Sequence, residues 1–171
     1  MAIASPLSAR WTVAALLTLT TVTGLIDAVS YLRLGRVFVA NMTGNVVFIG
    51  FSLHPHSGLS ALASVVAIGS FALGALGGGR LASSYGSRSA RRWLGTALAA
   101  QAALIGLTAV LTGTGALPFD GHRNLIVVGI LAVAMGIQNS TVRALGAPDL
   151  TTTVLTLTIT GLSADSSLAG G

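Results

Sequence analysis

The chain contains no cysteine, no lysine and no glutamate, so all nine basic residues are arginine and all four acidic residues are aspartate. The absence of cysteine excludes disulfide bonds and thiol chemistry. Charged residues make up only 8% of the 171 residues, whereas soluble domains carry about 25%. So few charges could hardly cover a soluble surface. Nucleic-acid binding, which a net charge of +5 would suggest, is not expected, because the arginines lie between apolar runs and there act as topology signals.

Long apolar runs are what the sequence has instead, and they predict an all-α, polytopic transmembrane bundle. A membrane-spanning helix needs about 20 mostly apolar residues, and we expect about six spans. They form a single integral membrane domain over residues 1–171. The first run lacks a small-residue cleavage pattern and is followed by further spans, so we interpret it as a span rather than a signal peptide. The six runs cover residues 11–32, 37–53, 59–79, 93–119, 124–142 and 150–164.

Two of these runs are ambiguous. The run over residues 37–53 is short and contains glycines and asparagines that lower helix propensity, so it could be a tilted, broken or re-entrant helix. The last run alternates apolar residues with threonine over 154–160, as a strand would. An isolated strand cannot span a bilayer, so we expect a helix there.

The arginines predict the orientation. With six crossings they divide seven against two, which places the N-terminus outside the cell by the positive-inside rule. A re-entrant second segment would change this count. The larger group is Arg33, Arg36, Arg80, Arg88, Arg91, Arg92 and Arg143, and the smaller group is Arg10 and Arg123.

An internal repeat relates the two ends of the chain, although chance similarity between membrane segments remains an alternative. Residues 24–35 align with residues 136–146 with one gap, and Asp27 then falls opposite Asn139. Copies that begin on the same side would be parallel repeats about the membrane normal. The plan resembles the three-plus-one-plus-three SWEET transporters, by fold-level analogy only. It divides the chain into a first repeat over residues 11–79, a linking span over 93–119 and an incomplete second repeat over 124–164.

The two copies also resemble a known family. The segments DAVSYLRLGRVFVANMTGNVVFIGFSL and GIQNSTVRALGAPDLTTTVLTLTITGLSADS resemble the two signatures of the YoaK-like family of bacterial multi-pass membrane proteins. The resemblance implies an integral inner-membrane protein, a domain of unknown function with no established substrate, cofactor or catalytic residue. It also implies a further hydrophobic stretch beyond residue 171. We therefore expect a truncated chain that lacks its last span or needs a partner in its place.

Polar residues inside the apolar runs are the candidate functional residues, because each is costly in hydrocarbon and needs a partner or a task. Asp27 is either a proton or cation site, or an interfacial residue that pairs with Arg33 or Arg36. Residues of the second run could present amides and unwound carbonyls to a solute, or could join helices by hydrogen bonds. Residues of the fifth run could complete the same site, or could pack and pair with Arg143. The expected substrate-lining set is Asp27, Asn41, Thr43, Asn45, Gln138, Asn139 and Thr141.

Two classes of function could explain these polar residues. The leading hypothesis is a transporter- or permease-like protein for a small solute, and the alternative is a non-transporting membrane scaffold or assembly protein. Transport predicts that Asp27, Asn45 and Asn139 converge on one polar cavity near mid-depth. A scaffold predicts separate, hydrogen-bonded pairs and no cavity.

Other chemistry is not expected. No HExxH, GxSxG or phosphate-loop pattern occurs, so we predict that the protein is not an enzyme. His54 and His56 lack further ligands for a metal, and no cofactor is expected. The expected partners are the lipid bilayer, a small-molecule solute and, through a stripe of small residues on the third span, a second copy of the chain. That stripe is Ser70, Gly74 and Gly78.

Overall fold

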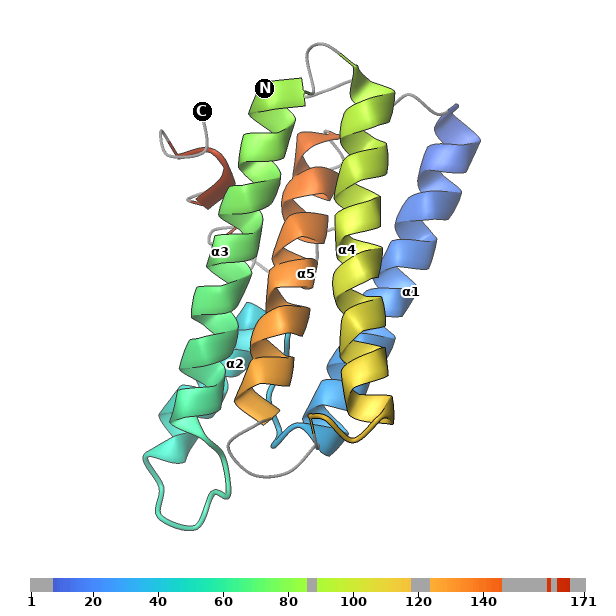
Figure 1. Ribbon diagram of the computed structural model, residues 1–171. Coiled ribbons are helices and arrows are strands. Elements are labelled where there is room, and N and C mark those ends of the chain that lie inside the picture. Colours follow the sequence, from blue (N-terminus) through green and yellow to red (C-terminus); the bar gives the residue numbers. More distant parts are fainter. Residues whose placement is uncertain (1–7, 86–88, 118–123, 146–159, 161–162, 167–171) are drawn as a thin grey trace.

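The computed structural model describes residues 8–85, 89–117, 124–145, 160 and 163–166. These residues form a bundle of helices without strands, as expected for a helical membrane protein. Four helices are long and apolar enough to cross a membrane, and one is too short. Figure 1 shows the four long helices side by side, with the short α2 at one end of the bundle. The helices are α1 (Ala9–Arg33), α2 (Met42–Ser52), α3 (Ala61–Tyr85), α4 (Ala90–Gly113) and α5 (Asn124–Ala144).

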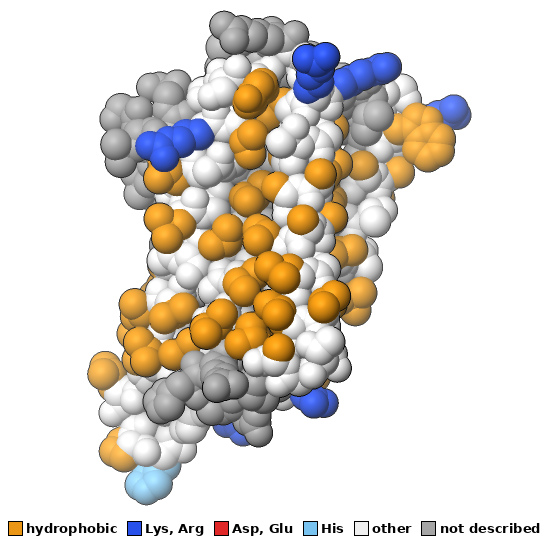
Figure 2. All heavy atoms as spheres, in the orientation of Figure 1, with side chains coloured by type: hydrophobic (Ala, Val, Ile, Leu, Met, Phe, Trp, Pro, Cys, Tyr) orange, Lys and Arg blue, Asp and Glu red, His pale blue; other side chains and the backbone are white. Residues whose placement is uncertain are grey.

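The surface matches this assignment. Figure 2 shows hydrophobic side chains spread along the length of one face, with arginine side chains gathered toward its two ends. Along α1 the exposed side chains are themselves apolar, and Leu25 and Leu32 are 63% and 76% exposed. An apolar band between charged ends is what a bilayer requires of a surface that faces its hydrocarbon.

The short α2 does not cross the bundle. At 1.5 Å per residue its 11 residues span about 16 Å, roughly half of the hydrocarbon thickness. Helix α1 finishes and α3 begins at the same end of the bundle, which we call the α2 end (Figure 1). The segment between them therefore enters and leaves the bundle at one end. Of the alternatives expected for the second apolar run, this path is the re-entrant one.

The sixth run is described only at its C-terminal end. Residues 146–159, which hold most of this run, lie outside the described residues. Arg143, in the last turn of α5, pairs with Asp165 at 2.7 Å. Asp165, just after the run, therefore lies at the end of the bundle opposite α2. The expected count of about six spans is not confirmed.

The helix directions change two further expectations. Helices α1 and α5 run in opposite directions (Figure 1), so the parallel relation expected for the two repeats is not confirmed. The division of the arginines changes as well. Arg33 and Arg36 lie at the α2 end, opposite the remaining described arginines. We call that opposite end the arginine-rich end, and it holds Arg10, Arg80, Arg91, Arg92 and Arg143.

The centre of the bundle is a close pair of helices, α3 and α5. A Cβ atom added at Gly74 of α3 would overlap the carbonyl oxygen of Val133, and one added at Gly136 of α5 would overlap that of Phe71. One turn along, Gly78 lies directly against Ser140. The expected small-residue stripe therefore packs within the chain, where its missing side chains let two backbones approach.

We predict that the α3–α5 contact tolerates no added methyl group. Gly74→Ala should lower the free energy of unfolding by about 1–3 kcal/mol, because the helices must separate to admit the Cβ atom. Gly77→Ala is the matched control on the same helix, since a Cβ atom there meets nothing within 4 Å. The control should be neutral or stabilise the protein by up to about 1 kcal/mol through helix propensity. Thermal unfolding in detergent checks both, and equal stabilities would contradict the prediction.

Candidate functional site

The candidate site is built around five non-helical residues, 37–41, which separate the end of α1 from the start of α2. Helix α1 stops because Gly35 has a φ of 86°, the left-handed conformation that favours glycine. The N–H of Arg36 then donates to the carbonyl oxygen of Tyr31 at 3.1 Å, which is the Schellman closure of a helix C-terminus. Beyond this turn, Val37 and Val39 are fully buried.

A buried, non-helical backbone must find hydrogen-bond partners outside a helix. Asp27, about 9 Å along α1 from its end, supplies most of them. Its Oδ1 atom accepts hydrogen bonds from the backbone N–H groups of Val39 and Ala40, each at 2.8 Å. The N–H of Asn41 also donates to Asp27. One turn further along α1, the hydroxyl of Ser30 donates to the carbonyl oxygen of Val37 at 2.8 Å.

Asn45 pairs with the remaining part of this segment. Its Nδ2 atom donates to the carbonyl oxygen of Phe38 at 2.7 Å, and its Oδ1 atom accepts from the Phe38 N–H at 3.0 Å. The fully buried amide therefore satisfies both backbone groups of this non-helical residue. Asn41 is the N-cap of α2, and its side chain accepts from the N–H of Gly44 at 3.1 Å.

These contacts give Asp27 an electrostatic role as well. The N-terminus of α2 points into the bundle toward the Asp27 carboxyl group, and a helix N-terminus carries a partial positive charge. No ion pair joins Asp27 to Arg33 or Arg36, all three of which are described. Of the two interpretations of Asp27, pairing with an arginine is therefore absent, and the carboxyl group instead holds α2 to α1. We call the contacts of Asp27, Ser30 and Asn45 with residues 37–41 the α2 anchor.

The second candidate half-site lies on α5 and connects three helices. The Nε2 atom of Gln138 donates to Thr23 Oγ1 of α1 at 2.7 Å, and its Oε1 atom accepts from Gln101 Nε2 of α4 at 2.5 Å. Thr23 lies one turn from Asp27 on the same face of α1. Asn139 and Thr141 donate instead to carbonyl oxygens of their own helix, those of Met135 and Ile137.

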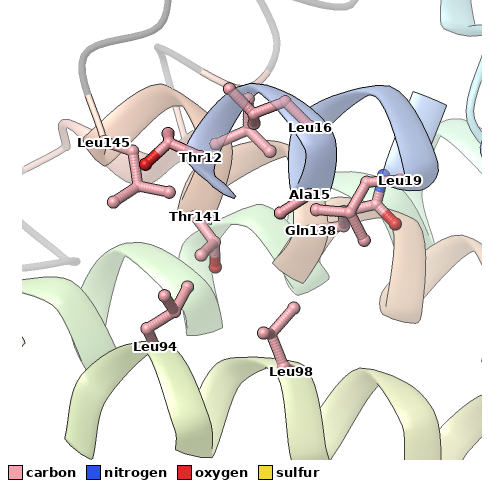
Figure 3. Close-up of a pocket in the computed structure, with 10 residues that line it drawn as sticks. Thr12, Ala15, Leu16, Leu19, Leu94, Leu98, Gln138, Thr141 and Leu145 are labelled. Atoms are coloured by element: carbon pink, nitrogen blue, oxygen red, sulfur yellow. The ribbon is translucent and has the colours of Figure 1, made fainter. Parts of the chain in front are cut away.

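The two half-sites therefore reach adjacent turns of α1, but only the second contributes to the cavity beside them. A cavity of about 50 Å³ lies between α1, α4 and α5, and its lining is almost entirely apolar. Figure 3 shows Leu94 and Leu98 of α4 pointing across it toward α1. Of the expected set, only Gln138 and Thr141 line it. The other lining residues are Thr12, Ala15, Leu16, Leu19, Leu94, Leu98, Val142 and Leu145.

Two details of the site could not be predicted from the sequence. Gln101 is a single neutral polar residue in a long apolar run, so no pattern in the sequence indicated that it bonds to Gln138. Thr43, the second residue of α2, has a buried hydroxyl without a hydrogen-bond partner among the described residues. No group of three or more metal-ligating side chains occurs in the described part of the chain.

The fold and the site define an α-helical membrane protein with a re-entrant helix whose N-terminus is anchored inside the bundle. The family model described as "Protein of unknown function (DUF1275)" matches residues 15–169. The chain is also 31% identical over 156 residues to the UPF0700 transmembrane protein YoaK of Bacillus subtilis (strain 168), covering 91% of this chain and 67% of that protein. The chain belongs to this family of unknown function, as its two signatures predicted. No solved structure matches it.

We predict that the α2 anchor needs an oxygen acceptor at position 27. Asp27→Ala should lower the free energy of unfolding by about 2–4 kcal/mol, because it leaves buried backbone N–H groups unpaired at about 1–3 kcal/mol each. Asp27→Asn retains an oxygen that can accept from the same N–H groups and should lose less than about 1 kcal/mol. Thermal unfolding of the two variants in detergent tests this, and an Asp27→Ala protein as stable as the Asn variant would refute the anchor.

Proposed function

We propose that this protein is a permease-like transporter for a small solute in the bacterial cell membrane, with its solute path beside the N-terminus of α2. The observation that carries the proposal is the α2 anchor, which holds a non-helical backbone segment and the helix N-terminus that follows it inside the bundle. Secondary transporters bind their substrates at such broken helices, because free backbone groups and helix ends can contact a solute there. The buried, unpartnered hydroxyl of Thr43 lies at this N-terminus.

The arrangement of the repeats supports the same proposal. Residues 24–35 of the chain align with residues 136–146, and α1 and α5, which carry them, are antiparallel. Copies that begin at opposite ends are inverted repeats, which relate the two halves of many secondary transporters about an axis in the membrane plane. Asp27 and Asn139 occupy corresponding positions in the two copies.

The weak attachment of α1 supports a moving part. Its described polar links to the rest of the bundle include the bond from Gln138 to Thr23 and the α2 anchor at Asp27 and Ser30. Above these links, an apolar cavity separates α1 from α4 and α5. The α3–α5 pair, in contrast, is in direct backbone contact. Rocking of one element against a fixed pair is the motion that alternating access requires.

A scaffold or assembly protein is the second candidate, and one observation favours it. Asn139 bonds to the backbone of its own helix, apart from Asp27 and Asn45, which both bond to residues 37–41, and the cavity is apolar. Separate pairs without a polar cavity are what a scaffold predicts. A transporter closed to both sides would present the same picture, so the two candidates differ in whether the α2 N-terminus ever meets water.

Thiol labelling distinguishes these candidates, because the sequence has no cysteine and any introduced thiol is then unique. We predict that Thr43→Cys reacts with a water-soluble, membrane-impermeant methanethiosulfonate in cells or inverted vesicles. Val127→Cys, at a fully buried position of the α3–α5 pair, is the matched control and should not react. If Thr43→Cys reacts no faster than Val127→Cys from either side, the site never opens and the scaffold is the better proposal.

We also propose that the arginine-rich end faces the cytoplasm, which places the start of α1 inside. Five described arginines lie at that end and two at the other, and the positive-inside rule assigns the richer end to the cytoplasm. This orientation is opposite to the one expected from six crossings, because a re-entrant α2 moves Arg33 and Arg36 away from the other group.

The orientation predicts the sidedness of two exposed positions. His56→Cys, in the loop between α2 and α3, should react with the impermeant reagent in intact cells or spheroplasts. Ser8→Cys, at the exposed N-cap of α1, should react only after the cells are opened or the vesicles inverted. Labelling of both positions in intact cells would show that the second run crosses and would restore the orientation expected from six crossings. The reverse pattern would place the arginine-rich end outside the cell.

A further inference from the structure

The cavity between α1, α4 and α5 lies just below the arginine-rich end of the bundle. On α4 it begins at Leu94, one turn after Arg91, and continues to Leu98. On α1 it extends from Thr12 to Leu19, so its length along the helices is about 10 Å. Its apolar walls and its depth fit the upper part of a hydrocarbon chain.

The cavity is open to its surroundings. Ala15 of α1 is exposed, and Leu98 of α4 is 37% exposed although its side chain points into the cavity in Figure 3. In a bilayer, an opening between two spanning helices meets lipid and not water. A groove that one acyl chain can enter is a defined site, unlike the convex surface of a helix.

The charge at the mouth of this groove selects the headgroup. Arg91, Leu94 and Leu98 are spaced by three and four residues, so the exposed Arg91 lies on the same face of α4 as the two leucines. Arg10 and Arg92 lie at the same end of the bundle. The acidic side chain described at this end is Asp165, which already pairs with Arg143. Basic residues above an apolar cleft between spanning helices favour an anionic phospholipid.

We propose that the groove between α1, α4 and α5 binds one anionic phospholipid, with an acyl chain between Leu16 and Leu98 and the phosphate at Arg91. The bound chain supplies packing between α1 and α4 that protein side chains do not. The side chain of Gln138 lines the inner part of the groove and donates to Thr23, which links α5 to α1. The bound acyl chain therefore lies beside this link. This proposal is independent of transport, since a scaffold could bind the same lipid.

Lipid retention by the full chain tests the proposal. The protein is purified in mild detergent, supplemented with phosphatidylglycerol or phosphatidylcholine of the same acyl composition, and measured by native mass spectrometry. One phosphatidylglycerol should remain bound at about fivefold higher occupancy than phosphatidylcholine, because one arginine near the surface favours a lipid with a net negative charge over a zwitterionic one by about 1 kcal/mol. Arg91→Gln should remove this preference. Arg36→Gln, at the α2 end, is the matched control and should retain it.

A second variant tests the groove without changing any charge. Ala15→Leu places three more carbon atoms in the groove and should reduce the retention of both lipids, while thermal unfolding without added lipid stays unchanged. Equal retention of the two lipids by the unaltered protein would overturn the proposal. So would equal losses in Arg91→Gln and Arg36→Gln, which indicate general surface charge, or full retention in Ala15→Leu.

Discussion

The constraint on which this structure depends is that backbone outside a helix must be paired when hydrocarbon surrounds the bundle. Residues 37–41 are non-helical and largely buried, and they are held by Asp27 and Ser30 of α1 and Asn45 of α2. A carboxyl group within a membrane helix costs about 2.5–3.5 kcal/mol to insert. Here that cost is offset because the same group satisfies several N–H groups that would otherwise be unpaired, each worth about 1–3 kcal/mol.

This local pairing decides the topology of the whole chain. Once α2 is anchored with its N-terminus inside the bundle, its other end returns to the side where α1 finished. Every later helix is then reversed relative to a chain in which residues 37–53 cross. The reversal makes α1 and α5 antiparallel and gathers five of the described arginines at one end. A few hydrogen bonds near the end of α1 thus determine both the relative direction of α1 and α5 and the distribution of charge.

The sequence predicts the long helices well, because about 20 apolar residues bounded by charge leave few alternatives. It also places Asp27, Asn41 and Asn45 among the residues that matter, since polar groups in apolar runs are rare. Hydropathy carries no information about the path of a segment, so it cannot distinguish a short span from a re-entrant helix. Likewise, the spacing of Gly74 and Gly78 predicts a close contact but not that α5 provides it. Partner choice depends on the three-dimensional arrangement.

The contacts divide the bundle into a fixed part and a part that can exchange partners. In α3 and α5 the backbones touch at Gly74 and Gly136, and a close-packed contact of this kind is sensitive to any change of volume. Helix α1 is joined instead by side-chain hydrogen bonds, such as that from Gln138 to Thr23. In membrane proteins such bonds contribute only about 0.6 kcal/mol on average, so water or a solute can replace them. A scaffold gains nothing from this division, whereas a transporter depends on it, because one helix must move while the rest of the bundle keeps its shape.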